Sequence, residues 1–427
     1  MNGSDSGSAL AISFLGAFQA SVSVLLTLSY GVLAARLKML SPSSAEDISR
    51  LCVNLFLPAL LITNVGSNLT LDNITIYVPV FIWSIVYAIV SAIIGKILTK
   101  VFKLPSWVTP AITFNNTTSL PLLLTQALAT TGILDTILTG GESASDAVDR
   151  ANSFFLINSM ISNAATLALG PKLLDKNEGG DDDETEAEDS DENNDNQQDQ
   201  EETNENSPLL PKPITHAAER VHDTASDWFH RLPYPIQVFL RKTGKILNPT
   251  VVGAIIAIII GLCPPIQHAL FANMDEGGIF RSWLTSSLKN IGELFTALQM
   301  FVVGSKLNSS LQTKEGSVGS KKALVVIFIV RFIFWGAVSL PVVYLLAAKT
   351  ELLDADPILW FAMCMMPTGP PAMILSALTD VAGIGRKGKM QVARLLTYMY
   401  AITPLIFVIV VLALKACEKA LQVRGEK

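Results

Sequence analysis

The chain has 427 residues, of which 50% are apolar and only 16% are charged, and its formal net charge is −6. Its mean hydropathy of +0.43 excludes an ordinary soluble domain, because too little polar sequence separates the apolar segments to cover them in water. The apolar segments are continuous rather than alternating, which excludes a membrane barrel and predicts an all-α polytopic membrane protein.

Ten apolar segments follow one another along the chain, and each has about the length that crosses ~30 Å of hydrocarbon as a helix. The predicted transmembrane helices are 12–34, 48–65, 76–98, 107–130, 152–170, 248–270, 284–307, 322–348, 357–383 and 391–416. Lysine and arginine gather in alternate loops, for example at 96–103 and 386–394, and such loops stay cytosolic. We therefore expect both termini on the lumenal or outer side and the loop after the fifth helix in the cytosol.

That loop, residues 172–246, changes character abruptly, since its segment 178–205 consists almost wholly of acidic, amide and hydroxyl side chains. It buries too little apolar surface to offset the entropy of ordering, so we expect a largely disordered cytosolic loop. A solvated spacer is the simplest interpretation of the acidic segment, and a regulatory docking segment is the alternative. The loop separates two membrane domains, residues 1–171 and 247–427.

Each membrane domain holds five predicted helices, and an odd number inverts the second domain relative to the first. This predicts two inverted five-helix repeats, the design of many secondary transporters. Helix-breaking residues fall in the fourth helix of each repeat. The fourth helix contains FNNTTSLP at 114–121, and the ninth contains PTGPP at 367–371.

A proline inside a membrane helix costs ~3 kcal/mol or more, and unpaired backbone in hydrocarbon adds to that cost, so paired breaks indicate a cavity. Two broken helices that cross there would direct half-helix N-termini, with their partial positive charge, at a carboxylate. The predicted substrate-binding residues are Asn115, Asn116, Thr117 and Pro121 in the fourth helix and Pro367, Thr368, Gly369, Pro370 and Pro371 in the ninth.

These residues resemble the auxin efflux carrier superfamily, in particular its PIN-like branch, and the presence of a long acidic loop suggests a fungal member. The resemblance rests on FNNTTSLPL at 114–122, on Asn248-Pro249 and on residues 367–375, and it covers both membrane domains but not the loop. It implies fourth and ninth helices that cross at prolines, as in sodium/proton antiporters and bile-acid symporters. It also implies the endoplasmic reticulum, with the vacuole and the plasma membrane as alternatives.

Other polar residues in the predicted helices are weaker candidates. Asn54 and Gln126 are further candidates for the lining of the cavity. Glu293 could carry a proton, or it could pair with Lys289 one turn earlier. For Arg331 we favour a side chain that extends to the cytosolic interface over one that binds an anion.

The function predicted from these features is a secondary transporter that exports or sequesters a small amphipathic organic anion, such as auxin (indole-3-acetate), by alternating access around the crossing. A cation/proton antiporter is an alternative, although segments 114–121 and 366–371 lack the carboxylates that it would need. A transport-inactive receptor or scaffold is a further alternative.

Several other classes of function are disfavoured. An intramembrane hydrolase lacks a plausible catalytic pair, and no cluster of histidine and glutamate in a helix predicts a metal, so we expect neither an enzyme nor a cofactor. GIGRKG at 383–388 fits a nucleotide-binding pattern, but no strand precedes it. We expect the organic anion and the lipid bilayer as partners and no nucleic acid, and the sequence leaves a homodimer open.

Overall fold

The computed structural model describes residues 3–173, 249–312, 321–381, 384 and 386–425. Over these residues the chain is helical, apart from turns, loops and one isolated antiparallel bridge. Most of the acidic loop, and with it the prediction of disorder, lies outside the described residues. The described parts before and after the loop belong to one compact unit.

The first domain contains four helical segments, of which some are continuous and some are broken, followed by a long fifth helix. Its elements are α1 (Gly3–Arg36), α2 (Pro42–Leu51), η1 (Cys52–Phe56), α3 (Leu57–Asn68), α4 (Ile74–Val101), α5 (Val108–Thr113), α6 (Ser119–Thr130), η2 (Leu134–Ile137) and α7 (Ala144–Leu173). The segment from α2 through η1 to α3 has no gap, so Pro58 lies inside a continuous helix. Its missing N–H interrupts the hydrogen-bond ladder at the π-helical turn η1, which lies directly before α3.

The second domain is also built from long, bent and broken helices. Its elements are α10 (Pro249–Leu262), α11 (Pro264–Phe271), η4 (Met274–Glu276), η5 (Arg281–Thr285), α12 (Ser286–Gln312), α13 (Lys321–Phe328), η6 (Ile329–Phe334), α14 (Trp335–Lys349), α15 (Pro357–Met365), α16 (Ile374–Val381), α17 (Arg386–Ala401), η7 (Thr403–Leu405) and α18 (Ile406–Arg424). The predicted helix 248–270 is not straight, because α10 and α11 meet at an angle of 100°. The bend lies at Cys263, directly before Pro264 and Pro265, and the residue before a proline is disfavoured in the helical conformation.

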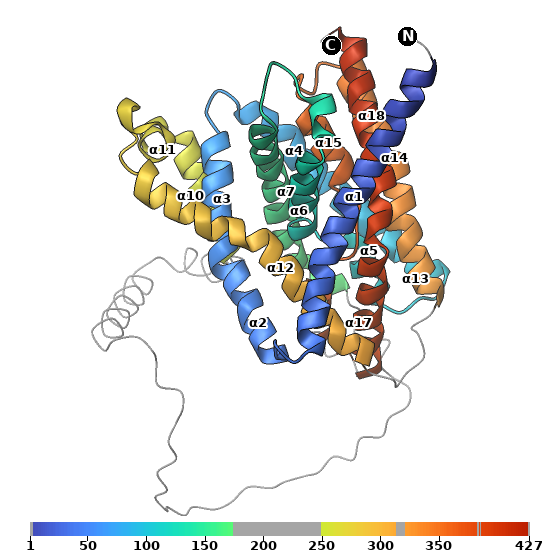
Figure 1. Cartoon of the computed structure of the whole chain (residues 1–427). Coiled ribbons are helices and arrows are strands. Elements are labelled where there is room, and N and C mark those ends of the chain that lie inside the picture. Colours follow the sequence, from blue (N-terminus) through green and yellow to red (C-terminus); the bar gives the residue numbers. More distant parts are fainter. Residues whose placement is uncertain (1–2, 174–248, 313–320, 382–383, 385, 426–427) are drawn as a thin grey trace, which may run out of the picture. The chain divides into compact units, whose positions relative to one another are not determined.

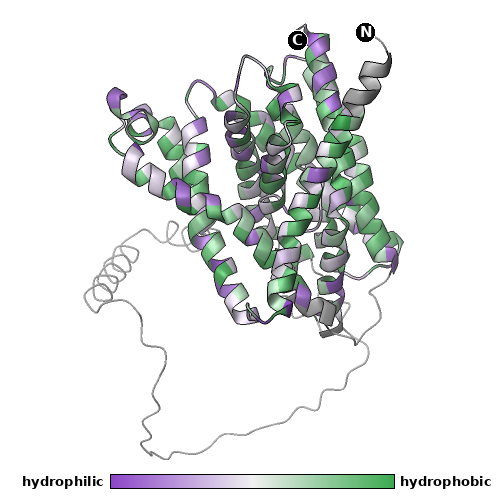
Figure 2. Cartoon of the chain, in the orientation of Figure 1, coloured by the Kyte–Doolittle hydropathy of each residue, from purple (hydrophilic) through white to green (hydrophobic). Residues whose placement is uncertain are grey.

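Five described helices are long and apolar enough to cross a membrane: Ala11–Arg36, Pro42–Asn68, Ile74–Val101, Ala144–Gly170 and Lys321–Lys349. The number rises to seven if the α10–α11 pair and the α17–α18 pair, which is bent by 46°, each form one span. Hydrophobic residues run along most of α13 and α14 (Figure 2). The chain is therefore a polytopic α-helical membrane protein.

The helices of the two domains pack in matching pairs. In the order of the predicted spans, the first lies against the seventh (α1 and α12) and the sixth against the second (α10 and α3). Within each domain the third packs on the fifth, as α4 does on α7 and α14 does on α18. Both termini lie at the same end of the bundle, and the junction of α1 with α2 lies at the opposite end (Figure 1).

Glycine lets α1 and α12 approach closely. A Cβ atom added at Gly304 would overlap the carbonyl oxygen of Leu28, and one added at Gly31 would overlap that of Phe301. Small residues at such positions are a common way to pack helices in lipid, where dispersion contacts rather than the hydrophobic effect hold helices together.

The buried centre of the bundle is formed by the short helices α5 and α15. Every residue of both helices is buried, which sets them apart from the half-exposed helices around them. These are the first halves of the two interrupted segments, so the interruptions lie in the interior rather than at the lipid.

Candidate functional site

The two interruptions follow α5 and α15. The chain leaves α5 at Phe114, whose backbone is extended, and α6 begins at Ser119. After α15 the chain runs through Pro367, Gly369, Pro370 and Pro371 before α16 begins. Gly369 has a φ of 113°, a value that favours glycine because it has no Cβ.

The two interruptions pair with each other through their backbones, and this paired region is called the crossing below. The N–H of Asn116 donates to the carbonyl of Pro370, and the N–H of Ala372 donates to that of Phe114, both at 3.0 Å. Asn115 and Pro371 form the antiparallel bridge between these two bonds. Backbone groups freed by the broken helices are therefore satisfied across the crossing, as hydrocarbon surroundings require.

Asn115 connects the two interruptions through its side chain. Its Nδ2 donates to the carbonyl oxygens of Met366 at 2.7 Å and Thr368 at 3.3 Å. The side chain is 3% exposed, and its Oδ1 has no hydrogen-bond partner. Asn115 therefore holds the crossing together and leaves one buried acceptor open.

Asn116 caps the helix that follows it. Its Oδ1 accepts from the N–H groups of Thr118 at 3.3 Å and Leu120 at 3.5 Å, and its Nδ2 donates to the hydroxyl of Tyr400 at 2.9 Å. Leu120 lies in the first turn of α6 and Thr118 directly before it, at the helix end that we expected to receive a carboxylate. In this state they are bonded to Asn116, so an anion could reach them only after that side chain turned away.

Arg331 lies at the crossing, and the prediction that its side chain extends to the interface is wrong. It is 0% exposed, its Nε donates to the carbonyl of Gly369 at 3.2 Å, and its Nη1 donates to that of Ile112 at 3.1 Å. The broken helices leave carbonyl groups without helical partners in the interior, and a guanidinium satisfies groups from both segments at once. The hydroxyl groups of Tyr87 and Tyr400 lie close enough to interact with it electrostatically.

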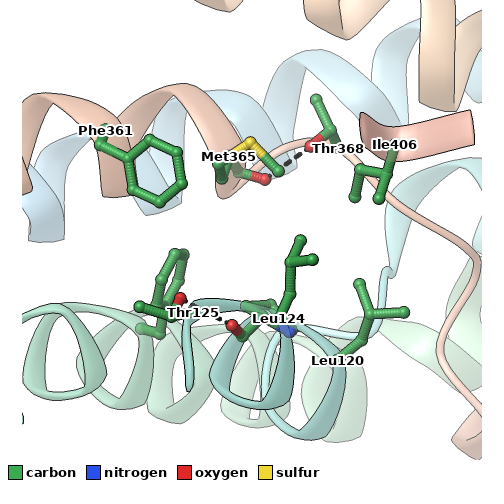
Figure 3. Close-up of a pocket in the computed structure, with 9 residues that line it drawn as sticks. Leu120, Leu124, Thr125, Phe361, Met365, Thr368 and Ile406 are labelled. Carbon is green, nitrogen blue, oxygen red and sulfur yellow. Dashed lines mark hydrogen bonds between the residues drawn. The ribbon is translucent and has the colours of Figure 1, made fainter. Parts of the chain in front are cut away.

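A small cavity lies beside the crossing, between α6, α7, α15 and α18. It is lined by Leu120, Pro121, Leu124, Thr125, Phe155, Phe361, Met365, Thr368 and Ile406. Phe361 and Met365 point across it toward the side chains of α6 (Figure 3). It has room for about one water molecule, so it must widen before a molecule of the size of indole-3-acetate can enter.

The predicted site residues fall into three groups. Pro121 and Thr368 line the cavity. The buried residues Asn115, Asn116, Thr117, Pro367, Gly369, Pro370 and Pro371 form the crossing next to it. Asn54, Gln126 and Glu293 do not line the cavity: Asn54 is exposed, Gln126 is half-buried on α6, and Glu293 is exposed on α12.

Glu293 also has a partner. Lys289 lies 3.9 Å from it and 3.8 Å from Asp149, in line with the alternative of simple pairing. Glu293 also lies away from the part of α12 that reaches the crossing. That part includes Met300, which contacts Ser119 and is seven positions after Glu293. A role for Glu293 in proton coupling stays a prediction.

Sequence reasoning missed the aromatic residues of the site, namely Phe155, Phe361, Tyr87 and Tyr400. Tyr87 donates to Oδ1 of Asn158 at 2.7 Å, and the Nδ2 of Asn158 has no partner. Aromatic residues are common in membrane helices, so the sequence offered no signal for these four. A charge in the middle of an apolar segment was the available signal for Arg331.

An ionic cluster at the start of α15 joins the two domains. Arg150 lies 2.7 Å from Glu142 and 3.3 Å from Asp356, and Asp356 accepts hydrogen bonds from the N–H groups of Ile358 and Leu359. Burial is the largest influence on both carboxyl groups, and it raises the pKa of Glu142 and of Asp356 above the usual values despite the nearby guanidinium.

Comparison with known proteins decides the family. A family model described as membrane transport protein matches residues 17–409. The chain belongs to this family, that of the auxin efflux carriers. This confirms the resemblance drawn from residues 114–122 and places the protein among membrane transporters rather than enzymes.

Three relatives are similar to this chain at 24–26% identity. An uncharacterized transporter of Schizosaccharomyces pombe is 24% identical over 408 residues, which cover 87% of this chain and 88% of that protein. PIN-LIKES 4 of Arabidopsis thaliana is 26% identical over 164 residues, 37% of each chain. An uncharacterized transporter of Saccharomyces cerevisiae is 25% identical over 169 residues, which cover 39% of this chain and 38% of that protein.

Proposed function

We propose that this membrane transport protein is a secondary transporter that exports or sequesters a small amphipathic organic anion, with indole-3-acetate as the first compound to test. The observation that carries the proposal is the crossing of two broken helices beside a mostly apolar cavity. Leu120, Phe155 and Phe361 suit an apolar body, and the crossing beside them holds the buried cation Arg331, which suits a carboxylate.

The proposed architecture is ten spans in two inverted repeats. The five long apolar helices and two bent pairs account for seven spans, and the broken pairs α5–α6 and α15–α16 together with α12 would supply the other three. The matching helix pairs of the two domains support this arrangement. So does the backbone bridge between Asn115 and Pro371, which joins equivalent interruptions.

Transport would follow from movement of one group of helices against the other. We place α4–α7 and α13–α18, which hold the crossing, in one group, and α1, α3, α10 and α12 in the other. The cavity opens to one side of the membrane and then to the other as the groups move. We keep the termini on the lumenal or outer side, the acidic loop in the cytosol, and the endoplasmic reticulum as the expected compartment.

The test is uptake of labelled indole-3-acetate and other carboxylates into vesicles that contain the purified protein. Pro121→Ala and Phe361→Ala change the lining of the cavity and should raise the KM or abolish uptake. Asn54→Ala is the matched control, because Asn54 is an exposed polar residue away from the cavity. Sodium or proton flux without carboxylate uptake would contradict the proposal, and so would equal uptake by the parent and both cavity variants.

A further inference from the structure

Arg331 carries a charge that the described part of the chain does not balance. It is fully buried, and its Nη2 has no hydrogen-bond partner. Its two bonds go to neutral carbonyl groups, and its electrostatic neighbours are the hydroxyls of Tyr87 and Tyr400. Among the side chains that the structure describes, no carboxylate forms an ion pair with it.

This charge is fixed to the crossing. The guanidinium bonds to Ile112 at the end of α5 and to Gly369 in the second interruption, so it must accompany both segments in any movement. An arginine side chain remains protonated in proteins, so it cannot lose its charge as a buried lysine can. Within the described part of the chain, the transporter without substrate therefore holds a positive charge at its centre that no carboxylate pairs.

We propose that Arg331 is the counter-charge of the substrate, which makes the transporter selective for monovalent organic anions and makes the substrate-loaded core electrically neutral. This inference rests on the function proposed above and specifies its substrate class. One carboxylate beside the crossing cancels the charge of Arg331. A neutral compound leaves one positive charge in the low-dielectric interior, and a dianion leaves one negative charge, so both are disfavoured.

The proposal determines which step of transport responds to the membrane potential. Export moves the neutral loaded core outward, and the empty core then returns with one positive charge. Over one cycle the net charge movement equals the export of one negative charge, as it would if the anion crossed the membrane alone. The voltage, however, acts on the return of the empty core. A charge that crosses the whole field changes a rate by up to about 50-fold per 100 mV.

The experiment compares two modes of transport in vesicles whose potential is set with potassium and valinomycin. Net efflux of labelled indole-3-acetate includes the return of the empty core, whereas exchange of labelled for unlabelled compound uses only loaded cores. In the parent, net efflux should change with voltage and exchange should not. In Arg331→Gln, whose amide can still donate to a carbonyl, exchange should become voltage-dependent.

Two further variants keep the result interpretable. Arg331→Lys retains the charge and should retain the parental pattern, while Arg281→Gln removes an exposed arginine elsewhere and should change nothing. The parent should also prefer indole-3-acetate over its neutral amide by at least about tenfold in KM, and Arg331→Gln should lose this preference.

Several results would overturn the inference. Voltage-dependent exchange in the parent would refute it while leaving the transporter itself intact, and this measurement does not depend on the folding of any variant. Equal KM values of the parent for the acid and the amide would also refute it. Absence of exchange in the parent would refute the proposed function, and the inference would fail with it.

Discussion

Replacing Asn115 with alanine should destabilise the crossing. The substitution removes the hydrogen bonds to the carbonyl oxygens of Met366 at 2.7 Å and Thr368 at 3.3 Å, and both acceptors lie in the buried centre. A buried group left unsatisfied costs about 1–3 kcal/mol. The substitution also removes Oδ1 of Asn115, a buried acceptor that has no partner in the folded protein, and this offsets part of the cost. We therefore expect a net destabilisation of about 2–3 kcal/mol.

The assay for this prediction is thermal unfolding in detergent, followed by thiol labelling of buried cysteines. Cys364 is 1% exposed in α15, so it reports the opening of the centre directly. At roughly 2–4 °C per kcal/mol, Asn115→Ala should lower the midpoint by about 4–12 °C.

Asn54→Ala is the matched control for this measurement, since it removes an exposed asparagine and should change stability by no more than about 0.5 kcal/mol. If both variants unfold at the same temperature as the parent, the side chain of Asn115 does not hold the two interruptions together.

Three other predictions follow from packing and charge. Gly304→Ala should lower the melting temperature, because its Cβ forces α12 away from Leu28 at a cost of about 1–3 kcal/mol. Gly336→Ala is the control and should be tolerated, because its Cβ would meet Ile409 at an ordinary contact distance of 3.5 Å. Equal melting temperatures of the two variants would contradict the close packing of α1 and α12. Burial raises the pKa of Glu142 and Asp356, so the folded state binds these protons more tightly than the unfolded state, and stability should rise as the pH falls from about 7 toward about 4. The double variant Glu142→Gln with Asp356→Asn should flatten this rise, and a parent that loses stability relative to the double variant over that range would show the sign to be wrong. Glu293→Gln should leave the pH dependence of carboxylate uptake unchanged, because Glu293 is exposed and pairs with Lys289; a flattened profile in transport assays would restore it as a proton carrier.

The class of the protein and the two interruptions that meet at the crossing could be predicted from the sequence. Apolar segments of the length of the bilayer determine membrane helices through local composition alone, and α4 extends only a few residues beyond its predicted span. Proline acts on its own backbone, so Pro121 and the prolines at 367–371 marked interruptions without knowledge of the partners. The family could also be recognised, because the residues that carry it form short motifs of consecutive positions.

The roles of individual side chains depend on what lies opposite them, and local sequence carries little information about that. Asn54 and Asn115 are the same residue type near a proline, yet one is exposed and the other joins two segments 251 positions apart. The bend at Cys263 was missed because an apolar composition concealed two consecutive prolines.

Arg331 shows the same division most clearly. Its sequence context, an apolar helix with one cation, permits extension to the interface or burial, since a long flexible side chain can do either. Only the tertiary structure supplies the carbonyl groups of Ile112 and Gly369 that hold it in the interior. The sequence by itself thus determined a membrane transporter with two broken helices, because hydrophobic length and proline act locally. The tertiary structure decided which polar groups meet at the crossing, because hydrogen bonds there join residues that are distant in the chain.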